Sequence, residues 1–313
     1  MNSKLQDFRP DGGKIRFTNT PDGFKIRYGV WSTGTIGTIF FLNGRTEYIE
    51  KYSGTISQFL KRQFSVVSLD WRSQGLSQRY FGRRDIGHIN DYREYQTDLK
   101  TLMSLEEIKK LPKPFVLVSH SMGGLIGLRA ISNKNHCFSA AIFSAPAWGA
   151  KIFENAVLNL IKGLAPVIKT PGIAKIKLYP GGKQPYVLTT SAKENALTSD
   201  EKQFKRLQSI VKAEPKLLVG PPTVGWGLAT AQELEKLEKA KPPKIPILIF
   251  MSAEETVVDN EAIKRFAEKS VNSKLVEISR AKHEVFLETP KIQKTAWSHI
   301  DDFLSKGTKS ASG

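Results

Sequence analysis

The sequence predicts an α/β fold in which a mostly parallel central sheet carries helices on both faces and a helical segment is inserted late in the sheet. Short apolar runs of strand length alternate with helical patterns through the first half of the chain, which is typical of a parallel sheet covered by helices. The same alternation returns near the C-terminus. Between the two regions, residues 148–222 are rich in proline and glycine and contain helical patterns without a convincing buried strand.

Apolar periodicity and turn residues place the elements of this core. Two β-rich runs at 14–19 and 24–30, separated by Pro21, Asp22 and Gly23, predict an opening hairpin. Apolar runs bounded by polar residues predict buried strands at 38–42, 65–69, 115–119, 140–143, 245–251 and 275–278. Helical spacing of apolar residues predicts helices at 52–63, 91–110, 122–132, 260–270 and 291–304.

The inserted segment combines an apolar stripe with an excess of positive charge. Residues 151–220 contain 12 Lys and Arg against 5 Asp and Glu, a net charge of +7. We therefore expect a core of residues 1–147 and 223–305, a separate unit at 148–222 and a disordered tail at 306–313. The stripe falls at helical spacing and predicts an amphipathic helix, and its members are Phe153, Val157, Leu160, Ile161, Leu164, Val167 and Ile168.

The composition bounds the class of protein and its partners. The chain has 313 residues, 40% of them apolar and 25% charged, which is enough for a large globular core. Its 47 Lys and Arg against 30 Asp and Glu give a net charge of +17, which favours anionic surfaces such as membrane headgroups or nucleic acid. We expect no nucleic acid partner, because zinc-ligand spacing, helix-turn-helix signatures and aromatic RNA-binding motifs are missing from the sequence.

Three features predict a location in the cytoplasm or at the inner face of the membrane. The first ten residues lack the apolar core of a secretory signal. The most apolar long stretch, 152–168, is too short and too interrupted by polar residues to span a bilayer. The single cysteine, Cys137, excludes an intrachain disulfide and fits a reducing compartment, and we expect it to be a small buried hydrophobe.

A serine at a strand-to-helix turn is the strongest chemical signal. The predicted strand at 115–119 leads through His120 into Ser121, Met122 and Gly123, and a helical pattern follows. A sharp turn of this kind exposes the serine hydroxyl, and small neighbours leave room for the tight backbone. Ser119 stands where the nucleophile-elbow pattern has its first glycine. We therefore predict that Ser121 is a nucleophile.

A serine hydroxyl needs a neighbouring base, and imidazole titrates in the right range. His283 follows a late strand and precedes a helical finish, so the order serine, acid, histidine of this architecture is kept. We expect surface or packing roles for the other histidines, which are His88, His120, His136 and His299.

The acid that orients this histidine is expected in the loop after the strand at 245–251. Glu254, Glu255 and Asp259 compete there. Asp259 directly precedes a helical pattern and has a strong alternative role as an N-cap. We choose Glu255, with Asp259 as the alternative acid.

Acyl transfer also needs two N–H groups directed at the developing oxyanion. In this architecture one comes from the residue after the nucleophile, which is Met122, and one from the loop after an earlier strand. The strand at 38–42 ends in Asn43, Gly44 and Arg45, and the glycine allows a tight turn. We expect the backbone amides of Arg45 and Met122 to form the oxyanion hole.

The whole pattern resembles the α/β-hydrolases, and more narrowly the branch that contains bacterial lysophospholipases and monoacylglycerol lipases. The resemblance covers residues 24–304 and rests on the segments 43–47, 70–77, 87–92, 119–124, 255–260 and 281–284, the last two being most similar to lysophospholipases. It departs from the family in having Ser119 and Ser73 in place of glycines, Asn43 in place of a histidine, and glutamate where many relatives have aspartate.

The resemblance implies a serine hydrolase in which Ser121 is the nucleophile, Glu255 the acid and His283 the base. It also implies that residues 148–222 form a helical cap, or lid, over the active site. An apolar stripe in such a lid could hold an acyl chain, and its lysines could contact phosphate headgroups or an anionic membrane; examples are Lys162, Lys169, Lys175 and Lys177.

The sequence thus predicts cleavage of the carboxylic ester of a single-chain lipid, most of all a lysophospholipid, through an acyl-enzyme on Ser121. One alternative keeps these residues but acts on a monoacylglycerol or on small esters as a general carboxylesterase. Another is a non-enzymatic lipid-binding protein. The sequence contains no dinucleotide fingerprint or metal-ligand cluster, so we expect neither a cofactor nor a metal.

Overall fold

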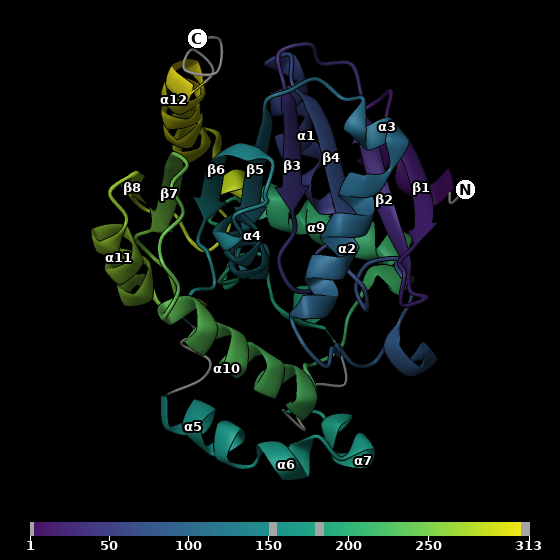
Figure 1. Ribbon diagram of the computed structural model, residues 1–313. Coiled ribbons are helices and arrows are strands. Elements are labelled where there is room, and N and C mark those ends of the chain that lie inside the picture. Colours follow the sequence, from purple (N-terminus) through teal and green to yellow (C-terminus); the bar gives the residue numbers. More distant parts are fainter. Residues whose placement is uncertain (1–2, 150–154, 179–184, 308–313) are drawn as a thin grey trace.

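The computed structural model describes residues 3–149, 155–178 and 185–307, and it is built on an eight-stranded sheet (Figure 1). The strand order is β1-β2-β4-β3-β5-β6-β7-β8, and only the pairs β1–β2 and β2–β4 are antiparallel. The predicted fold class is therefore confirmed. The strands are β1 (Lys14–Asn19), β2 (Lys25–Trp31), β3 (Thr38–Leu42), β4 (Ser65–Asp70), β5 (Phe115–His120), β6 (Phe138–Ser144), β7 (Ile247–Ser252) and β8 (Ser273–Ile278).

Helices cover both faces of the sheet because neighbouring strand residues point to opposite sides. In β3, Ile39 and Phe41 belong to the apolar core that includes α1 (Ser53–Lys61) and α12 (Pro290–Gly307). Phe40 and Leu42 belong to the core on the other face. That second core includes α2 (Arg93–Ser104), α4 (Met122–Ser132) and α11 (Asn260–Lys269), with the short α3 (Glu106–Lys109).

Most predicted elements appear within two residues of their expected ends, and two expectations were wrong. The helix predicted at 91–110 is divided at Leu105, whose extended backbone (φ −66°, ψ 133°) separates α2 from α3. Cys137 is exposed rather than buried, because it lies in the connection just before β6 and not within the strand. The described residues also form five 3₁₀-helices that were not predicted, namely η1 (Ser3–Phe8), η2 (Ile49–Tyr52), η3 (Tyr80–Gly82), η4 (Pro215–Leu217) and η5 (Val285–Leu287).

Between β6 and β7 the chain forms a layer of helices beyond the carboxyl ends of the strands (Figure 1). One group consists of α10 (Val224–Glu238) and the helices that pack on it, α5 (Asn155–Gly163), α6 (Ala165–Ile168) and α7 (Pro171–Ala174). The other consists of α8 (Tyr186–Thr189) and α9 (Glu201–Ala213), which pack on each other, with α9 also against η1 and η2.

The predicted apolar stripe is divided between a buried and an exposed side. Ile161 and Ile168 are buried, whereas Leu160, Leu164 and Val167 are 62%, 46% and 52% exposed. The helix is broken at Leu164, between α5 and α6. Phe153 lies outside the described residues, and so do the side chain of Val157 and most of the tail predicted at 306–313.

Arg206 joins α9 to the core. Its guanidinium donates hydrogen bonds to the carbonyls of Phe8, Glu50 and Lys51 and to the hydroxyl of Ser53, at 2.9 to 3.2 Å. Burial lowers the pKa of Arg206. These contacts hold α9 beside η2, and therefore next to the loop that follows β3.

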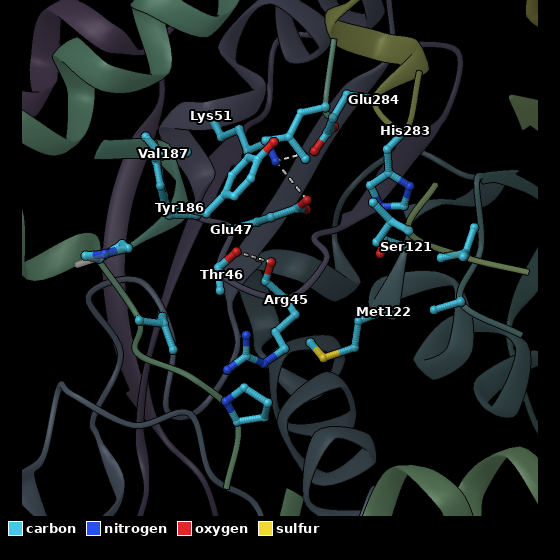
Figure 2. Close-up of a pocket in the computed structure, with 18 of the residues that line it drawn as sticks. Arg45, Thr46, Glu47, Lys51, Ser121, Met122, Tyr186, Val187, His283 and Glu284 are labelled. Atoms are coloured by element: carbon cyan, nitrogen blue, oxygen red, sulfur yellow. Dashed lines mark hydrogen bonds and ion pairs between the residues drawn. The ribbon is translucent and has the colours of Figure 1, made fainter. Parts of the chain in front are cut away.

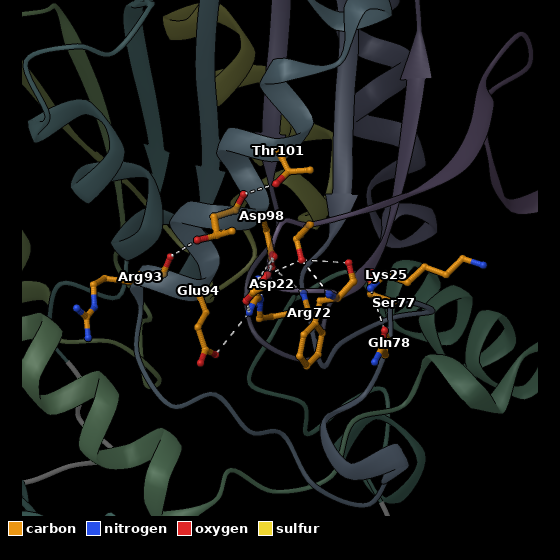
Figure 3. Close-up of polar contacts among 12 residues, drawn as sticks. Asp22, Lys25, Arg72, Ser77, Gln78, Arg93, Glu94, Asp98 and Thr101 are labelled. Atoms are coloured by element: carbon orange, nitrogen blue, oxygen red, sulfur yellow. Dashed lines mark hydrogen bonds and ion pairs between the residues drawn. The ribbon is translucent and has the colours of Figure 1, made fainter.

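A buried ion pair ties α2 to the strands (Figure 3). Arg72 follows β4 and is completely buried. Its guanidinium donates to Asp98 of α2 at 2.7 and 2.9 Å and to Asp22 of the β1–β2 turn at 2.6 and 3.1 Å. Burial raises the pKa of Asp98 to about 6 despite its hydrogen bonds from Arg72. The positive charge of Arg72 therefore stabilises the ionised form of Asp98 in the core.

Substituting Arg72→Met should lower the free energy of unfolding by about 3 to 5 kcal/mol, because it leaves the buried Asp98 without its cation. Lys109→Met is the matched control, since it removes an exposed pair with Glu106 at 2.8 Å that contributes no more than about 1 kcal/mol. Urea unfolding of both variants measures the difference. Equal effects of the two substitutions would contradict the role assigned to Arg72.

Candidate active site

A largely apolar pocket of about 580 Å³ lies between the sheet and the helical layer. Ser121 after β5, Arg45 after β3, Val258 after β7 and His283 after β8 all line it. Each of these residues follows the carboxyl end of a parallel strand, where α/β sheets bind their ligands. The helical layer contributes further lining residues from α8, α9 and α10, including Tyr186, Val187, Leu207, Val211 and Trp226.

Ser121 occupies a strained turn between β5 and α4. Its backbone has φ 51° and ψ −119°, a conformation that costs a non-glycine residue about 1 to 3 kcal/mol. The surroundings hold it there, because the Ser121 amide donates to the carbonyl of Ser144 at 3.1 Å and the Ser121 carbonyl accepts from Gly124 and Ala147. Ser119 lies fully buried in β5, so the regular strand accommodates its small side chain.

Gly123 allows α4 to approach the end of β3. A Cβ at this position would lie 2.1 Å from the carbonyl oxygen of Leu42 and 2.6 Å from that of Asn43. Any larger residue would push the helix away from the strand. The close contact brings the first residue of α4, Met122, to the same wall of the pocket as Arg45.

His283 and Glu255 form a buried hydrogen-bonded pair. His283 Nδ1 lies 2.8 Å from Glu255 Oε2, and Glu255 Oε1 accepts from the amides of Val257 and Val258 at 2.6 and 3.2 Å. Burial alone would raise the pKa of Glu255, but these hydrogen bonds and the adjacent imidazole lower it below its ordinary value. The carboxylate accepts, so Nδ1 donates, and Nε2 is the nitrogen that can act as a base. Figure 2 shows Ser121 next to the His283 ring.

Asp259, the alternative acid, has a different position. Its carboxylate accepts from the amide of Glu261 at 2.9 Å and caps the N-terminus of α11. It also lies 3.6 Å from the guanidinium of Arg265. The structure therefore brings Glu255, and not Asp259, to His283.

The loop after β3 is held by its own hydrogen bonds on both sides of Arg45. The amide of Gly44 donates to the carboxylate of Glu47, and the amide of Thr46 donates to Gln74 Oε1. The Arg45 side chain extends to the carbonyl of Gly220 at 2.8 Å and lies over the ring of Trp226. The Met122 amide belongs to the first turn of α4, and amides in the first turn have no partner within the helix.

The remaining histidines lie away from the serine hydroxyl. His88 is buried, with Nδ1 2.6 Å from Thr223 Oγ1 and Nε2 3.2 Å from Asn90 Oδ1. His136 and His299 are half-buried and do not line the pocket. His120 is completely buried behind the pocket, 4.6 Å from His283 between ring centroids.

Sequence reasoning missed the buried polar cluster around His120. The cluster also contains Glu47, Lys51, Tyr52 and Glu284. A weak signal was present, because Glu47, Lys51 and Glu284 each directly precede an aromatic or aliphatic residue that the fold buries. Nothing in the local pattern showed that these distant segments meet.

An eight-stranded sheet with a serine on a strand-to-helix turn and a histidine–carboxylate pair after later strands defines an α/β-hydrolase. The chain belongs to the family described as serine aminopeptidase, S33, whose profile matches residues 34–290.

Individual proteins are similar to this chain over most of its length. The chain is 27% identical over 270 residues to a probable lysophospholipase L2 from Haemophilus influenzae, covering 85% of this chain and 83% of the relative. It is 26% identical over 279 residues to lysophospholipase L2 from Escherichia coli K12, and the match covers 84% of this chain and 78% of the relative. The structure of a soluble variant of monoglyceride lipase from Saccharomyces cerevisiae has the same fold, with a TM-score of 0.73 and 20% identity. The match covers 96% of this chain and 98% of the lipase. Among the residues that the structure describes, no helix has both the length and the apolarity to cross a bilayer.

The lowered pKa of Glu255 predicts a pH-dependent contribution to stability. A carboxylate with a depressed folded-state pKa stabilises the fold above its ordinary pKa of 4.5, and this contribution is lost as the pH falls through the folded-state value. Glu255→Gln should therefore reduce the free energy of unfolding by about 1 to 3 kcal/mol at pH 7, with a smaller difference from wild type below pH 4.5.

Urea unfolding at both pH values measures this effect. Asp259→Ala serves as a control that removes an N-cap worth about 1 kcal/mol without disturbing His283. A Glu255→Gln effect that stayed constant down to the acid limit of folding would contradict the assignment of a charged Glu255.

Proposed function

We propose that this protein is a serine hydrolase that cleaves the carboxylic ester of a single-chain lipid, with a lysophospholipid as the preferred substrate. The observation that carries the proposal is the buried Glu255–His283 pair beside Ser121 in a largely apolar pocket. The similarity to lysophospholipases supports the substrate class. The catalytic roles of the individual residues are part of the proposal.

In this mechanism Ser121 Oγ attacks the ester carbonyl carbon while His283 Nε2 takes the hydroxyl proton. Glu255 holds the ring in the required tautomer and stabilises the imidazolium. The amides of Arg45 and Met122 stabilise the tetrahedral oxyanion. The ester C–O bond then breaks, and the glycerophospho-alcohol leaves with the proton from His283. Water, deprotonated by His283, attacks the acyl-enzyme and releases the fatty acid.

We assign residues 148–222 as a cap that holds the acyl chain. Tyr186, Val187, Leu207 and Val211 of α8 and α9 line the pocket with apolar surface. Trp226 of α10 joins them from just beyond the proposed boundary. An apolar cavity binds an alkyl chain because the chain leaves water, at roughly 25 cal/mol per Å² of buried surface.

Two other activities fit parts of the same site. A monoacylglycerol has the same acyl ester without a phosphate, and the apolar lining would accept its acyl chain as well. Short esters need only the residues around Ser121. These alternatives keep the mechanism and differ in the group that leaves, so relative turnover separates them.

Replacing Ser121 by Ala should abolish both lipid ester cleavage and labelling by a fluorophosphonate, because the proposed mechanism forms the acyl-enzyme on Ser121 Oγ. Ser119→Ala is the matched control, since it removes a buried hydroxyl two residues away that does not line the pocket. Initial rates on lysophosphatidylethanolamine, monoacylglycerol and a short nitrophenyl ester should rank in that order. Turnover retained in Ser121→Ala would contradict the mechanism, and a preference for the short ester would contradict the lipid assignment.

We further propose that α5, α6 and the segment after α7 contact an anionic membrane from its cytoplasmic side. Leu160, Leu164, Val167 and Ile176 are 46% to 62% exposed there. Lysines alternate with them along the chain at positions 162, 169, 175 and 177. Exposed apolar residues interleaved with cations suit an interface of acyl chains and anionic headgroups, where each cation contributes about 1 kcal/mol. The single cysteine fits the reducing side of such a membrane.

Vesicles that contain phosphatidylglycerol should bind the protein, and added salt should weaken the binding because it screens the surface charges. Leu164→Glu should lower the partition coefficient about 10-fold, since it removes a side chain worth about 1.5 to 3 kcal/mol on burial. Val271→Glu, at a position 97% exposed between α11 and β8, should have little effect. Sedimentation with vesicles measures both variants. Salt-independent binding, or equal loss in both, would contradict this membrane contact.

A further inference from the structure

A cluster of buried charges forms part of the pocket wall, where Glu47, Lys51 and Glu284 are lining residues (Figure 2). It consists of two carboxylates, two basic side chains and one hydroxyl, each no more than 6% exposed, contributed by Glu47, Lys51, Tyr52, His120 and Glu284. Charges are buried at high cost unless they are paired and hydrogen-bonded. This cluster meets that condition, and the mechanism above does not use it.

Lys51 is the centre of the cluster. Its ammonium donates to Glu47 Oε1 at 2.9 Å and to Glu284 Oε1. The other oxygens of the same two carboxylates lie 2.8 and 2.9 Å from the Tyr52 hydroxyl. Lys51 and Tyr52 thus bridge two acidic residues that are 237 positions apart in the sequence. Burial opposes a charged Lys51, but the two carboxylates raise its pKa.

His120 supplies the second positive charge. Its Nδ1 lies 3.1 Å from the carbonyl oxygen of Ser144, which can only accept, so Nδ1 donates. Its Nε2 lies at ion-pair distance from both carboxylates, 3.3 Å from Glu284 Oε1 and 3.5 Å from Glu47 Oε1, without hydrogen-bond geometry. Burial opposes a charged ring, but the two carboxylates outweigh it and raise the pKa of His120, which favours the protonated form. Ligand atoms of Glu47, His120 and Glu284 lie within 4.8 Å of one another, as metal ligands would, and the ammonium of Lys51 is hydrogen-bonded to both of these carboxylates.

Three members of the cluster are each attached to a different part of the proposed active site. Glu47 accepts the amide of Gly44, next to Arg45 in the loop after β3. A Cβ at Gly44 would lie only 2.8 Å from that carboxylate, so the loop packs directly on it. His120 precedes Ser121, and its ring shares the Ser144 carbonyl with the Ser121 amide.

Glu284 makes the third attachment. It follows His283 directly, and its amide donates to the carbonyl of Leu197 at 2.8 Å. The hydrogen bonds and ion pairs among these side chains therefore connect the oxyanion loop, the nucleophile turn and the loop of the general base.

We propose that Lys51, with Glu47, His120 and Glu284, forms a positioning network that fixes the distances between the Arg45 amide, Ser121 and His283. This inference rests on the proposed function of those three residues. The network does not touch the reacting atoms. It acts on kcat, because misplacing a catalytic group by about 1 Å can cost about 100-fold in rate, whereas the apolar surface that binds the acyl chain stays in place.

Lys51→Met removes the central cation and leaves the carboxylates facing each other. We expect kcat on a short nitrophenyl ester to fall between about 10-fold and 100-fold, with little change in KM. The rate of fluorophosphonate labelling should fall in parallel, since it needs the same geometry. Lys51→Arg keeps the charge and should recover part of the rate.

Glu284→Gln is the second variant, because it keeps the shape of the side chain and is the safer choice if Lys51→Met does not fold. It should also lower kcat and the labelling rate. Arg72→Met is the control for stability alone, since it breaks another buried ion pair outside the pocket. Its kcat should match wild type well below its melting temperature.

These experiments distinguish a failure of the positioning role from a failure of the proposed function. Wild-type kcat in folded Lys51→Met and Glu284→Gln, with only a lower melting temperature, would overturn the positioning role. A kcat loss in Arg72→Met as large as in the Lys51 variant would also overturn it, because any loss of stability would then be sufficient. A wild-type protein that neither hydrolyses esters nor reacts with the fluorophosphonate would instead overturn the proposed function.

Discussion

The hydrogen bond between Glu255 and His283 depends on the order of the strands. β7 and β8 are parallel neighbours, so the loops that follow them emerge side by side, and the acid of one reaches the imidazole of the other. β5 lies two strands from β7, and the turn that follows β5 places Ser121 in the same pocket as His283. β3, on the other side of β5, contributes the loop of Arg45. The loops after β3, β5, β7 and β8 all lie at the carboxyl ends of the strands. The site therefore consists of residues that are far apart in the sequence.

The polar part of this site is supported by a second layer of charges. Glu47, His120 and Glu284 stand within two positions of Arg45, Ser121 and His283 in the sequence, and Lys51 is hydrogen-bonded to both carboxylates. The apolar part comes from a different source, the helical layer between β6 and β7. Arg206 attaches α9 of that layer to η2, which contains Lys51. The apolar lining from α9 and the positioning network therefore both contact the same short segment of the core, η2.

Local signals account for what the sequence predicted. The strand, turn and helix around Ser121 are adjacent in the chain, so the motif was visible without the fold. The capping position of Asp259 was recognisable because N-caps depend on neighbouring residues alone. The break at Leu105 escaped notice because neither glycine nor proline marks it. The cluster around Lys51 escaped because its bond to Glu284 spans 233 residues, and periodicity carries no information about pairing at that distance.

A crystal structure of the protein after reaction with a long-chain fluorophosphonate tests the central claim most directly. The account predicts phosphorus bonded to Ser121 Oγ, with its free oxygen within hydrogen-bond distance of the Arg45 and Met122 amides. It also predicts His283 Nε2 beside the ester oxygens and the alkyl chain between α8, α9 and α10. Phosphorus on another residue, or a His283 ring separated from Ser121 with Glu255 turned away, would contradict it.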